Sequence, residues 1–276
     1  ESPPPSFMNV TIHRWHLLVR RMGKIAFLCG DTPAARYCAE VFTDRFPEKV
    51  AFVCKIGNDT TKYVSNRNTI KTTCTKRVVP LLQFRSEKRL LELAQNEDVT
   101  TIVCLWWPHI LKQLQKHVLN VINTHPSLLP YNRGKYPYYW SIMDGTPFGV
   151  TIHRIDNGVD TGRILWQSKI DVLPESTGGG LYRAGVTDMV HLFMANINEI
   201  AAQRFPAGKD QDEEDATFHL AKDFDRDKLL DLDEYEHIGW LLDDLRARTF
   251  KNLESGRRVE IDGKFYRIHI KLVEEE

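Results

Sequence analysis

Several features that would assign a chain to a special class of protein are missing from this sequence. It contains no run of eighteen apolar residues, which is about the length that a membrane-spanning helix requires. It has no internal repeat, no Gly-x-Gly-x-x-Gly fingerprint for dinucleotides and no phosphate-loop lysine motif. The length of 276 residues fits one large domain, with at most a small appendage.

Cysteine is scarce, and its spacing is uninformative for metals. The five cysteines are odd in number and include no Cys-x-x-Cys pair, so they give neither a disulfide framework nor a zinc ribbon. We expect reduced, mostly buried thiols, which are typical of a cytoplasmic protein, and we predict a cytoplasmic location. His109 and His117 are eight residues apart with no third ligand in view, so we predict no metal site.

Net charge is also absent, because 37 basic residues balance 37 acidic ones. The balance is uneven along the chain: residues 207–276 carry −8 and the remainder carries +8. Excess positive charge in the larger part suits an anionic small molecule. The acidic C-terminal part argues against nucleic acid there, since phosphate contacts need clustered Lys and Arg.

The first half of the chain alternates strands with helices. Apolar runs predict strands over 24–29, 50–54, 100–105 and 118–123, and helices are expected over 33–46, over 85–96 and shortly after Pro108. Thr32 is the predicted cap of the first helix, and residues 55–77 read as a long loop. This order predicts an α/β fold with a Rossmann-like, doubly wound, mostly parallel sheet.

The second half of the chain follows a different pattern. Strands are expected over 147–154 and 163–169, then a long helix capped by Ser176 or Thr177 that reaches about 205. Residues 206–215 read as a charged linker, 233–249 as a helix, and 259–268 as a hairpin centred on Asp262-Gly263. We therefore predict an N-terminal extension over 1–22, a catalytic domain over 23–206 and a small α+β region over 207–276.

Three polar residues stand where such a fold places its ligands. The apolar run before Asn123 predicts a strand ending there, so Asn123 and His125 should project to one side at its carboxyl end. Asp160 follows in Asp-Asn-Gly-Val-Asp-Thr-Gly. An amide, an imidazole and a carboxylate in one pocket can handle a developing oxyanion and one mobile proton. The competing interpretation is that Asn123 and His125 only satisfy loop backbone groups.

The surrounding motif resembles a known family. The run Asn123-x-His125-Pro-Ser-Leu-Leu-Pro, with Arg133-Gly134, Gly149-Val-Thr-Ile-His153 and Asp160-x-Gly162, is similar to the formyltransferases that use 10-formyltetrahydrofolate. The strand-helix pattern before it extends the resemblance to roughly residues 23–205. Pro130-Tyr-Asn-Arg-Gly, Pro137-Tyr-Tyr-Trp140 and softer patterns near the C-terminus resemble the nucleotide-sugar N-formyltransferases most.

The resemblance implies an enzyme of the formyltransferase fold that moves the formyl group of 10-formyltetrahydrofolate to an amino group on a nucleotide-linked sugar. A dTDP- or UDP-4-amino-4,6-dideoxyglucose is the implied acceptor type. Asn123 would donate to the oxyanion, His125 would take the amine proton or help stabilise the oxyanion, and Asp160 would orient the imidazole. Another amine (glycinamide ribonucleotide or methionyl-tRNA), a formyltetrahydrofolate hydrolase and a silent sugar-nucleotide binding protein remain the alternatives.

The family also implies binding residues. The folate cofactor would contact His109, Ile110, Leu111, Lys135, Asp156, Asn157, Gly158 and Val159. Predicted substrate contacts are Asp31, Thr32, Lys76, Arg77, Arg85, Arg133, Tyr136 and Tyr139. A solvated basic face competes with these roles for Lys135, Lys76, Arg77 and Arg85, and core packing competes for the tyrosines. Leu129-Pro130 is a candidate cis peptide. A homodimer is a further expectation, because relatives are often dimers and the hairpin offers an edge.

Overall fold

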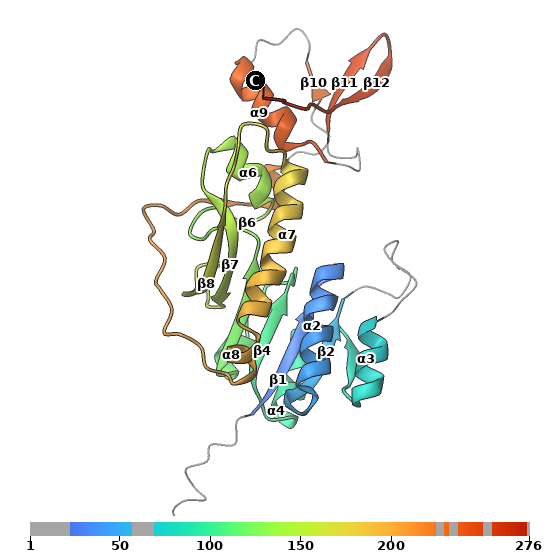
Figure 1. Cartoon of the computed structure of the whole chain (residues 1–276), viewed down its shortest axis with the longest axis vertical. Helices are drawn as coiled ribbons and strands as arrows, with labels where there is room; N and C mark the ends of the chain where they lie inside the picture. Colours follow the sequence, from blue (N-terminus) through green and yellow to red (C-terminus); the bar gives the residue numbers. More distant parts are fainter. Residues whose placement is uncertain (1–22, 57–68, 225–228, 232–236, 251–255, 275–276) are drawn as a thin grey trace, which may run out of the picture.

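The computed structural model describes residues 23–56, 69–224, 229–231, 237–250 and 256–274. Its centre is a seven-stranded sheet with the strand order β3-β2-β1-β4-β5-β7-β8 (Figure 1). The strands are β1 Lys24–Cys29, β2 Val50–Lys55, β3 Leu81–Gln83, β4 Val99–Leu105, β5 Asn120–His125, β7 Phe148–Arg154 and β8 Ile164–Ile170. The pairs from β3 to β5 are parallel, and β5, β7 and β8 pair antiparallel. The predicted mostly parallel sheet is confirmed.

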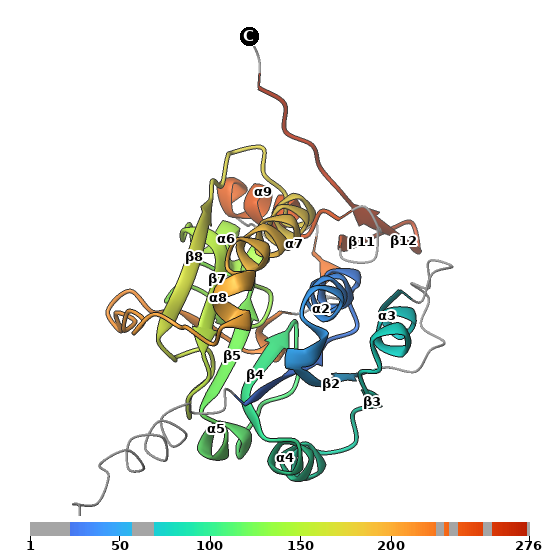
Figure 2. The same ribbon diagram turned by 60° about the horizontal axis from the view of Figure 1, so that its bottom comes forward.

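Helices cover both faces of this sheet (Figure 2). One face carries α2 Pro33–Arg45, α3 Thr69–Arg77, α7 Gly178–Ala195 and α8 Ile197–Ala201, and the other carries α4 Glu87–Asn96 and the short α5 Leu114–His117. A 3-10 turn, η1 Pro47–Lys49, follows α2. A hydrophobic core lies on each face of the sheet, and successive strand residues point into the two cores alternately. Phe27 packs into the core on the α2 side, and Leu28 packs into the core on the α4 side. This alternation is the period of two that a strand buried on both faces requires.

Local signals place the first helices as expected. The Thr32 hydroxyl accepts a hydrogen bond from the Ala35 N–H at 3.1 Å, and Pro33 opens the helix with its missing N–H at no cost. Ser86 caps α4 in the same way, through the Arg89 N–H. The Leu129–Pro130 peptide is cis, as predicted. All five cysteines are free and buried, which confirms that expectation.

The predicted loop over 55–77 is wrong over much of its length. Lys55 completes β2, and Thr69–Arg77 form helix α3, while 57–68 lie outside the described residues. The helix is mostly polar; Thr73 is buried, and Ile70 and Cys74 are the apolar side chains that reach the core. Ile70 and Cys74 are one helical turn apart, so both side chains point into the core beside α2. Burial of these two side chains stabilises a helix whose sequence shows little helical periodicity. The edge strand β3 was not predicted either.

Two other expectations about boundaries need correction. The long helix was expected to reach about residue 205, but α7 ends at Ala195 and a separate α8 follows. The Asn196 side chain donates to the Leu192 carbonyl at 2.8 Å at this break. The start was correct, since Thr177 accepts from the Gly180 N–H at 3.1 Å. The strand over 118–123 lies two residues later than predicted, at Asn120–His125.

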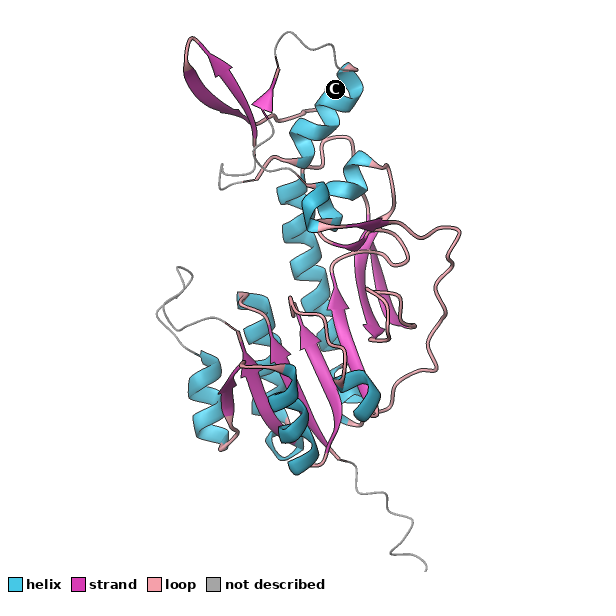
Figure 3. Ribbon diagram, turned by 180° about the vertical axis from the view of Figure 1, so that it is seen from behind, coloured by secondary structure: helices cyan, strands magenta, loops and turns pink. Residues whose placement is uncertain are grey.

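The C-terminal region packs at one end of the molecule (Figures 1 and 3). Helix α9 Ile238–Ala247 lies against α6 Pro137–Met143, and β10 Leu229–Leu230, β11 Arg257–Ile261 and β12 Lys264–Ile268 form a small sheet. Asp262 and Gly263 have φ of 50° and 72° at the tip of the predicted hairpin, which is confirmed. The first residues of the predicted C-terminal helix, like the extension over 1–22, lie outside the described residues. No described helix has the length and apolar character needed to cross a membrane.

Residues 206–215 were predicted to be a linker, but they lie against the larger part of the chain. Lys209 bridges to Ile164, and β9 Phe218–His219 pairs with β6 Arg133–Gly134. A 3-10 turn, η2 Ala221–Asp223, follows β9. The segment has few apolar residues and is held through backbone and side-chain hydrogen bonds instead. The domain boundary near residue 206 stays a prediction.

Candidate active site

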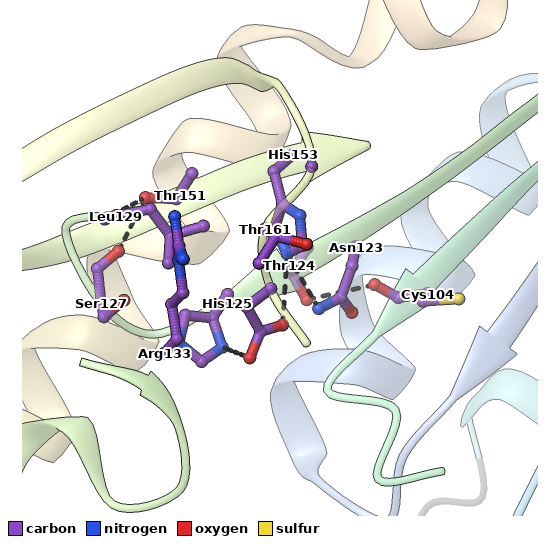
Figure 4. A network of polar contacts seen from close by, with 12 residues as sticks. Cys104, Asn123, Thr124, His125, Ser127, Leu129, Arg133, Thr151, His153 and Thr161 are labelled. Atoms are coloured by element: carbon purple, nitrogen blue, oxygen red, sulfur yellow. Dashed lines mark hydrogen bonds and ion pairs between the residues drawn. The ribbon is translucent and has the colours of Figure 1, made fainter. Parts of the chain in front are cut away.

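The carboxyl end of β5 carries Asn123 and His125 (Figure 4). The loop between β7 and β8 brings Asp160 to them. The Nδ1 atom of His125 lies 3.5 Å from Oδ2 of Asp160. The His125 side chain is buried, and those of Asn123 and Asp160 are partly buried. The three predicted catalytic side chains therefore lie in one place.

A second imidazole belongs to this cluster and was not predicted. His153, on β7, lies with Nε2 3.4 Å from Oδ1 of Asp160 and 3.2 Å from the amide nitrogen of Asn123. Asp160 thus lies between two histidines, one at each carboxylate oxygen. The sequence did contain a signal, since His153 ends the Gly149-Val-Thr-Ile-His153 motif, but no role was attached to it.

Backbone carbonyls fix the proton positions on both rings. Nε2 of His125 lies 3.1 Å from the Asn132 carbonyl, and Nδ1 of His153 lies 2.7 Å from the Arg154 carbonyl. A ring nitrogen against a carbonyl must carry hydrogen, because a carbonyl only accepts. At His125 the nitrogen that faces Asp160, Nδ1, is therefore the one that can accept a proton.

The same argument orients the amide of Asn123. With the hydrogen of the His153 ring on Nδ1, facing the Arg154 carbonyl, Nε2 can accept a hydrogen bond from the Asn123 amide nitrogen at 3.2 Å. The second N–H of this amide stays available, and Asn123 borders the cavity described below. The residue can therefore offer one fixed donor to a negative oxygen placed in that cavity.

Charge and burial act against each other at Asp160. Burial would raise the pKa of this carboxyl, but His125, His153 and the Gly134 N–H, which donates at 3.0 Å, together hold its pKa well below the usual range. Asp160 is therefore a carboxylate at neutral pH. Its backbone lies in the left-handed region with φ of 55°, which is unusual for a residue other than glycine.

The balance at His125 favours the neutral ring. Burial lowers the pKa of His125 below its ordinary value of 6.5, and the charges of His153 and Lys135 lower it further. Asp160 and the Asn132 carbonyl act in the opposite direction but do not overcome burial. A neutral imidazole at pH 7 can accept a proton, as a general base must.

A cavity of about 320 Å³ opens next to these residues. Seven of the eight predicted cofactor residues line it: His109, Ile110, Leu111, Lys135, Asp156, Gly158 and Val159. Asn157 does not line it. The remaining wall includes Trp107 and four residues after the expected linker, Phe218, His219, Leu220 and Ala221, which sequence reasoning missed. Nothing in their local sequence indicates a ligand, because they reach the cavity only through the β6–β9 pairing.

None of the predicted substrate residues lines this cavity, and several make internal contacts. Asp31 pairs with Arg36 and Arg77 pairs with Asp44, each at 2.8 Å, while Thr32 caps α2. Tyr136 stacks against Phe224, and Tyr139 is buried with its hydroxyl donating to Asp244 at 2.7 Å. Arg133 is 7% exposed at its side chain and pairs with Glu213 at 2.8 Å. Lys76 and Arg85 are exposed. The structure thus gathers the catalytic and cofactor sets but not the substrate set.

Metal-binding geometry is absent from the residues that the structure describes, where no three His, Cys, Asp or Glu side chains form a candidate cluster.

Comparison with known proteins then decides the family. A family model described as formyl transferase matches residues 24–196. The chain belongs to the formyl transferase family. The match covers the sheet, Asn123, His125, His153 and Asp160, and it ends within the break between α7 and α8.

Individual formyl transferases are similar to the chain in sequence or in fold. A dTDP-4-amino-4,6-dideoxyglucose formyltransferase of Mycobacterium tuberculosis is 32% identical over 143 residues, which are 52% of this chain; the chain spans 60% of that relative. The structure of a sugar N-formyltransferase from Shewanella is 20% identical with a TM-score of 0.72, covering 92% of this chain and 99% of that one. An N-formyltransferase from Helicobacter canadensis, in complex with folinic acid and dTDP-3-aminofucose, is 20% identical with a TM-score of 0.66, covering 88% of this chain and 85% of that one. The two structures share the fold of this chain.

Proposed function

We propose that this formyl transferase moves the formyl group of 10-formyltetrahydrofolate to the amino group of a nucleotide-linked amino sugar, of the dTDP- or UDP-4-amino-4,6-dideoxyglucose type. The observation that carries the proposal is the meeting of Asn123, His125 and Asp160 beside a cavity lined by the predicted folate residues. The similarity to a dTDP-4-amino-4,6-dideoxyglucose formyltransferase supports the acceptor class. The folinic acid and amino-sugar nucleotide in the Helicobacter relative support both substrates.

The geometry accounts for each step of such a transfer. The amine nitrogen attacks the formyl carbon, and the carbonyl oxygen becomes negative. The free N–H of Asn123 donates to that oxygen. His125 takes the proton that the amine loses, and Asp160 stabilises the imidazolium. The bond from the formyl carbon to the folate nitrogen then breaks, and the same proton can pass to that nitrogen.

The cavity suits a folate. Its walls combine apolar side chains, such as Ile110, Leu111 and Val159, with the polar side chains of Asp156 and Lys135. The indole N–H of Trp107 is buried there and has no hydrogen-bond partner among the described residues, so a ligand acceptor could satisfy it. When bound, 10-formyltetrahydrofolate supplies the formyl group, and the chain supplies orientation and the proton acceptor.

The identity of the acceptor is inferred from the relatives and from the charge of the chain. The internal contacts of Arg133 and Tyr139 favour structural roles for both, so their predicted sugar contacts stay predictions. The −8 balance of residues 207–276 disfavours tRNA, because that partner calls for clustered Lys and Arg. A cytoplasmic location, with its reducing conditions, is consistent with five free thiols.

Mass spectrometry of candidate acceptors tests the proposal. The chain is incubated with 10-formyltetrahydrofolate and, in parallel, with the dTDP- and UDP-linked 4-amino sugars, glycinamide ribonucleotide, methionyl-tRNA or no amine. A mass gain of one formyl group on an amino-sugar nucleotide is expected. Formylation of another amine alone, or free formate without an amine, would replace the proposal with the corresponding alternative. Folate binding without any turnover would support the silent binding protein.

A further inference from the structure

The segment from Lys209 to His219 runs across the active site, although it follows the part of the chain that the family model matches. Figure 1 shows in orange the part of the chain that leaves the end of α8 and contains this segment; it passes outside β8 and returns near β6. Its two ends are tied by the bridge to Ile164 and by the β6–β9 pairing. Between these ties, one side chain hydrogen-bonds to backbone carbonyls of the loop that carries Asp160.

That side chain is Gln211, and its amide makes three hydrogen bonds, two through the nitrogen and one through the oxygen. Its amide nitrogen donates to the carbonyl oxygens of Asp160 and Gly162, each at 2.7 Å. Its amide oxygen accepts from Nε of Arg133 at 3.0 Å. Since a guanidinium only donates, Arg133 fixes which end of the amide faces the loop. Glu213 in turn holds Arg133 through two hydrogen bonds, at 2.8 and 3.0 Å.

The loop needs such support where Gln211 provides it. Asp160 has a left-handed backbone, which a residue with a Cβ adopts at a cost. At Gly162 the chain passes so close to Arg154 that an added Cβ would lie 1.9 Å from its carbonyl oxygen. Two hydrogen bonds to the carbonyls of Asp160 and Gly162 hold this backbone on both sides of Thr161.

The other half of the loop is held separately. The Asp156 carboxylate accepts from the Gly158 N–H at 3.0 Å and from the Thr161 hydroxyl at 2.6 Å. Asp156, Gly158 and Val159 line the cavity. The cofactor-facing half is therefore closed by its own turn, and the half that carries the Asp160 carboxylate is held by Gln211.

We propose that Gln211 is a positioning residue that fixes the Asp160 carboxylate against His125 and His153 for formyl transfer. The inference rests on the proposed function. Gln211 does not line the cavity, and it acts through the backbone of Asp160. Arg133 and Glu213 complete the support by fixing the direction of the Gln211 amide.

The test compares two substitutions that keep the length of the side chain. Gln211→Met removes both donors without adding charge, and Gln211→Glu keeps an acceptor for Arg133 but turns oxygens toward two carbonyls. Asp210→Asn is the matched control, because the neighbouring Asp210 is 78% exposed and pairs with the exposed side chain of Arg163 rather than with the backbone of the loop. In both Gln211 variants kcat should fall about tenfold or more, since a small misplacement of a catalytic group can cost as much as a hundredfold.

Separate effects on kcat and KM distinguish a displaced Asp160 carboxylate from a loss of overall stability. The KM for the folate and the thermal midpoint should stay near the wild-type values, because Asp156 holds the cofactor half. Asp210→Asn should match the wild type in all three. Unchanged kcat in both Gln211 variants, or losses that follow a lowered thermal midpoint, would overturn the assignment.

A second readout needs no turnover, so it decides on Gln211 even if no acceptor is formylated. The His125 ring is titrated by NMR in the wild type, in Gln211→Met and in Asp210→Asn. His125 is faced by Asp160, His153 and Lys135. Displacing the Asp160 carboxylate removes the nearest negative charge, so the pKa of His125 should fall in Gln211→Met alone. An unchanged His125 titration would contradict the inference, whatever the assays of formyl transfer give.

Discussion

At the scale of single residues, the site is organised around one carboxylate. Asp160 faces His125 on one side and His153 on the other, and each ring uses its remaining nitrogen on a backbone carbonyl. The arrangement leaves Nδ1 of His125, the nitrogen that faces Asp160, as the position where this ring can accept a proton. The amide of Asn123 contacts His153, so the proposed oxyanion donor and the proposed proton acceptor are both linked to Asp160 through the histidines.

Asp160→Asn tests the electrostatic part of this account. The wild-type pKa of His125 is below 6.5, so activity should persist as pH falls through 6.5 and should drop as pH falls through the pKa of the folded state. Asp160 raises this pKa; removing its charge should move the acidic limb of the residual rate to still lower pH. The rate at the plateau should fall by at least about a hundredfold, because the imidazolium loses its counter-charge. Initial rates across pH for both proteins check this. A limb that moves to higher pH would contradict the assignment.

Asn123→Ala tests the oxyanion donor. Loss of one such donor costs about 2.7–4 kcal/mol of transition-state stabilisation, so kcat should fall by roughly a hundredfold to a thousandfold. The folate KM should change little, since the donor acts mainly on the negative oxygen of the transition state. Steady-state kinetics measure both quantities. An increase in KM with unchanged kcat would show that Asn123 binds the ground state only.

At the scale of elements, close backbone approach ties the C-terminal region to the larger part of the chain. Gly178 lies in the first turn of α7, where an added Cβ would lie 1.9 Å from the carbonyl oxygen of Ala247 at the end of α9. The next residue, Gly179, donates its N–H to the Thr249 carbonyl at 2.9 Å. The consecutive glycines, which weaken a helix start, are here the contact between two helices.

Gly178→Ala should therefore destabilise the protein by about 1–3 kcal/mol, because α9 must move away from the new methyl group. Gly180→Ala is the matched control on the same turn, where the nearest atom is the Thr177 hydroxyl at 3.2 Å. Its effect should stay within about 1 kcal/mol, since alanine also favours the helix. Urea unfolding of both variants measures the difference. Equal losses would show that the α7–α9 contact is not tight.

The elements also show what the sequence could predict. Strands buried on both faces, the Thr32 cap and the Asp262-Gly263 turn depend on neighbouring residues, and all were predicted. Helix α3 depends on only two buried side chains, and the role of residues 206–215 depends on Gln211 meeting a loop about fifty residues earlier in the chain. The periodicity of apolar residues along the sequence does not indicate contacts between segments so far apart in the chain. Asn123, His125 and Asp160 could be grouped from the sequence because they lie in the block that resembles the family, while the place of His153 became clear only from its distance to Asp160.

At the scale of the whole molecule, the cavity lies between the sheet and the segment that follows α8. Phe218 and Leu220 border it from one side, and Ile110 and Val159 border it from the other. These apolar side chains are exposed, and a folate would cover them. Binding should therefore stabilise the whole fold.

Tetrahydrofolate at about a hundred times its Kd should raise the free energy of unfolding by about 2.7 kcal/mol. Ile110→Asp should abolish this gain, because Ile110 lines the cavity and is 67% exposed, so the charge spares the fold but opposes the ligand. Leu119→Asp is the control, with a 73% exposed side chain that does not line the cavity. Thermal unfolding with and without ligand measures each. A wild-type protein with no stabilisation would argue against a folate in this cavity.

The most direct test of the central claim is a single-turnover assay with 10-formyltetrahydrofolate and dTDP-4-amino-4,6-dideoxyglucose, comparing the wild type with His125→Ala. The account predicts that the wild type transfers the formyl group to the sugar amine. It also predicts that His125→Ala binds tetrahydrofolate and unfolds like the wild type but transfers no formyl group above background. Formyl transfer by His125→Ala at the wild-type rate would contradict the account.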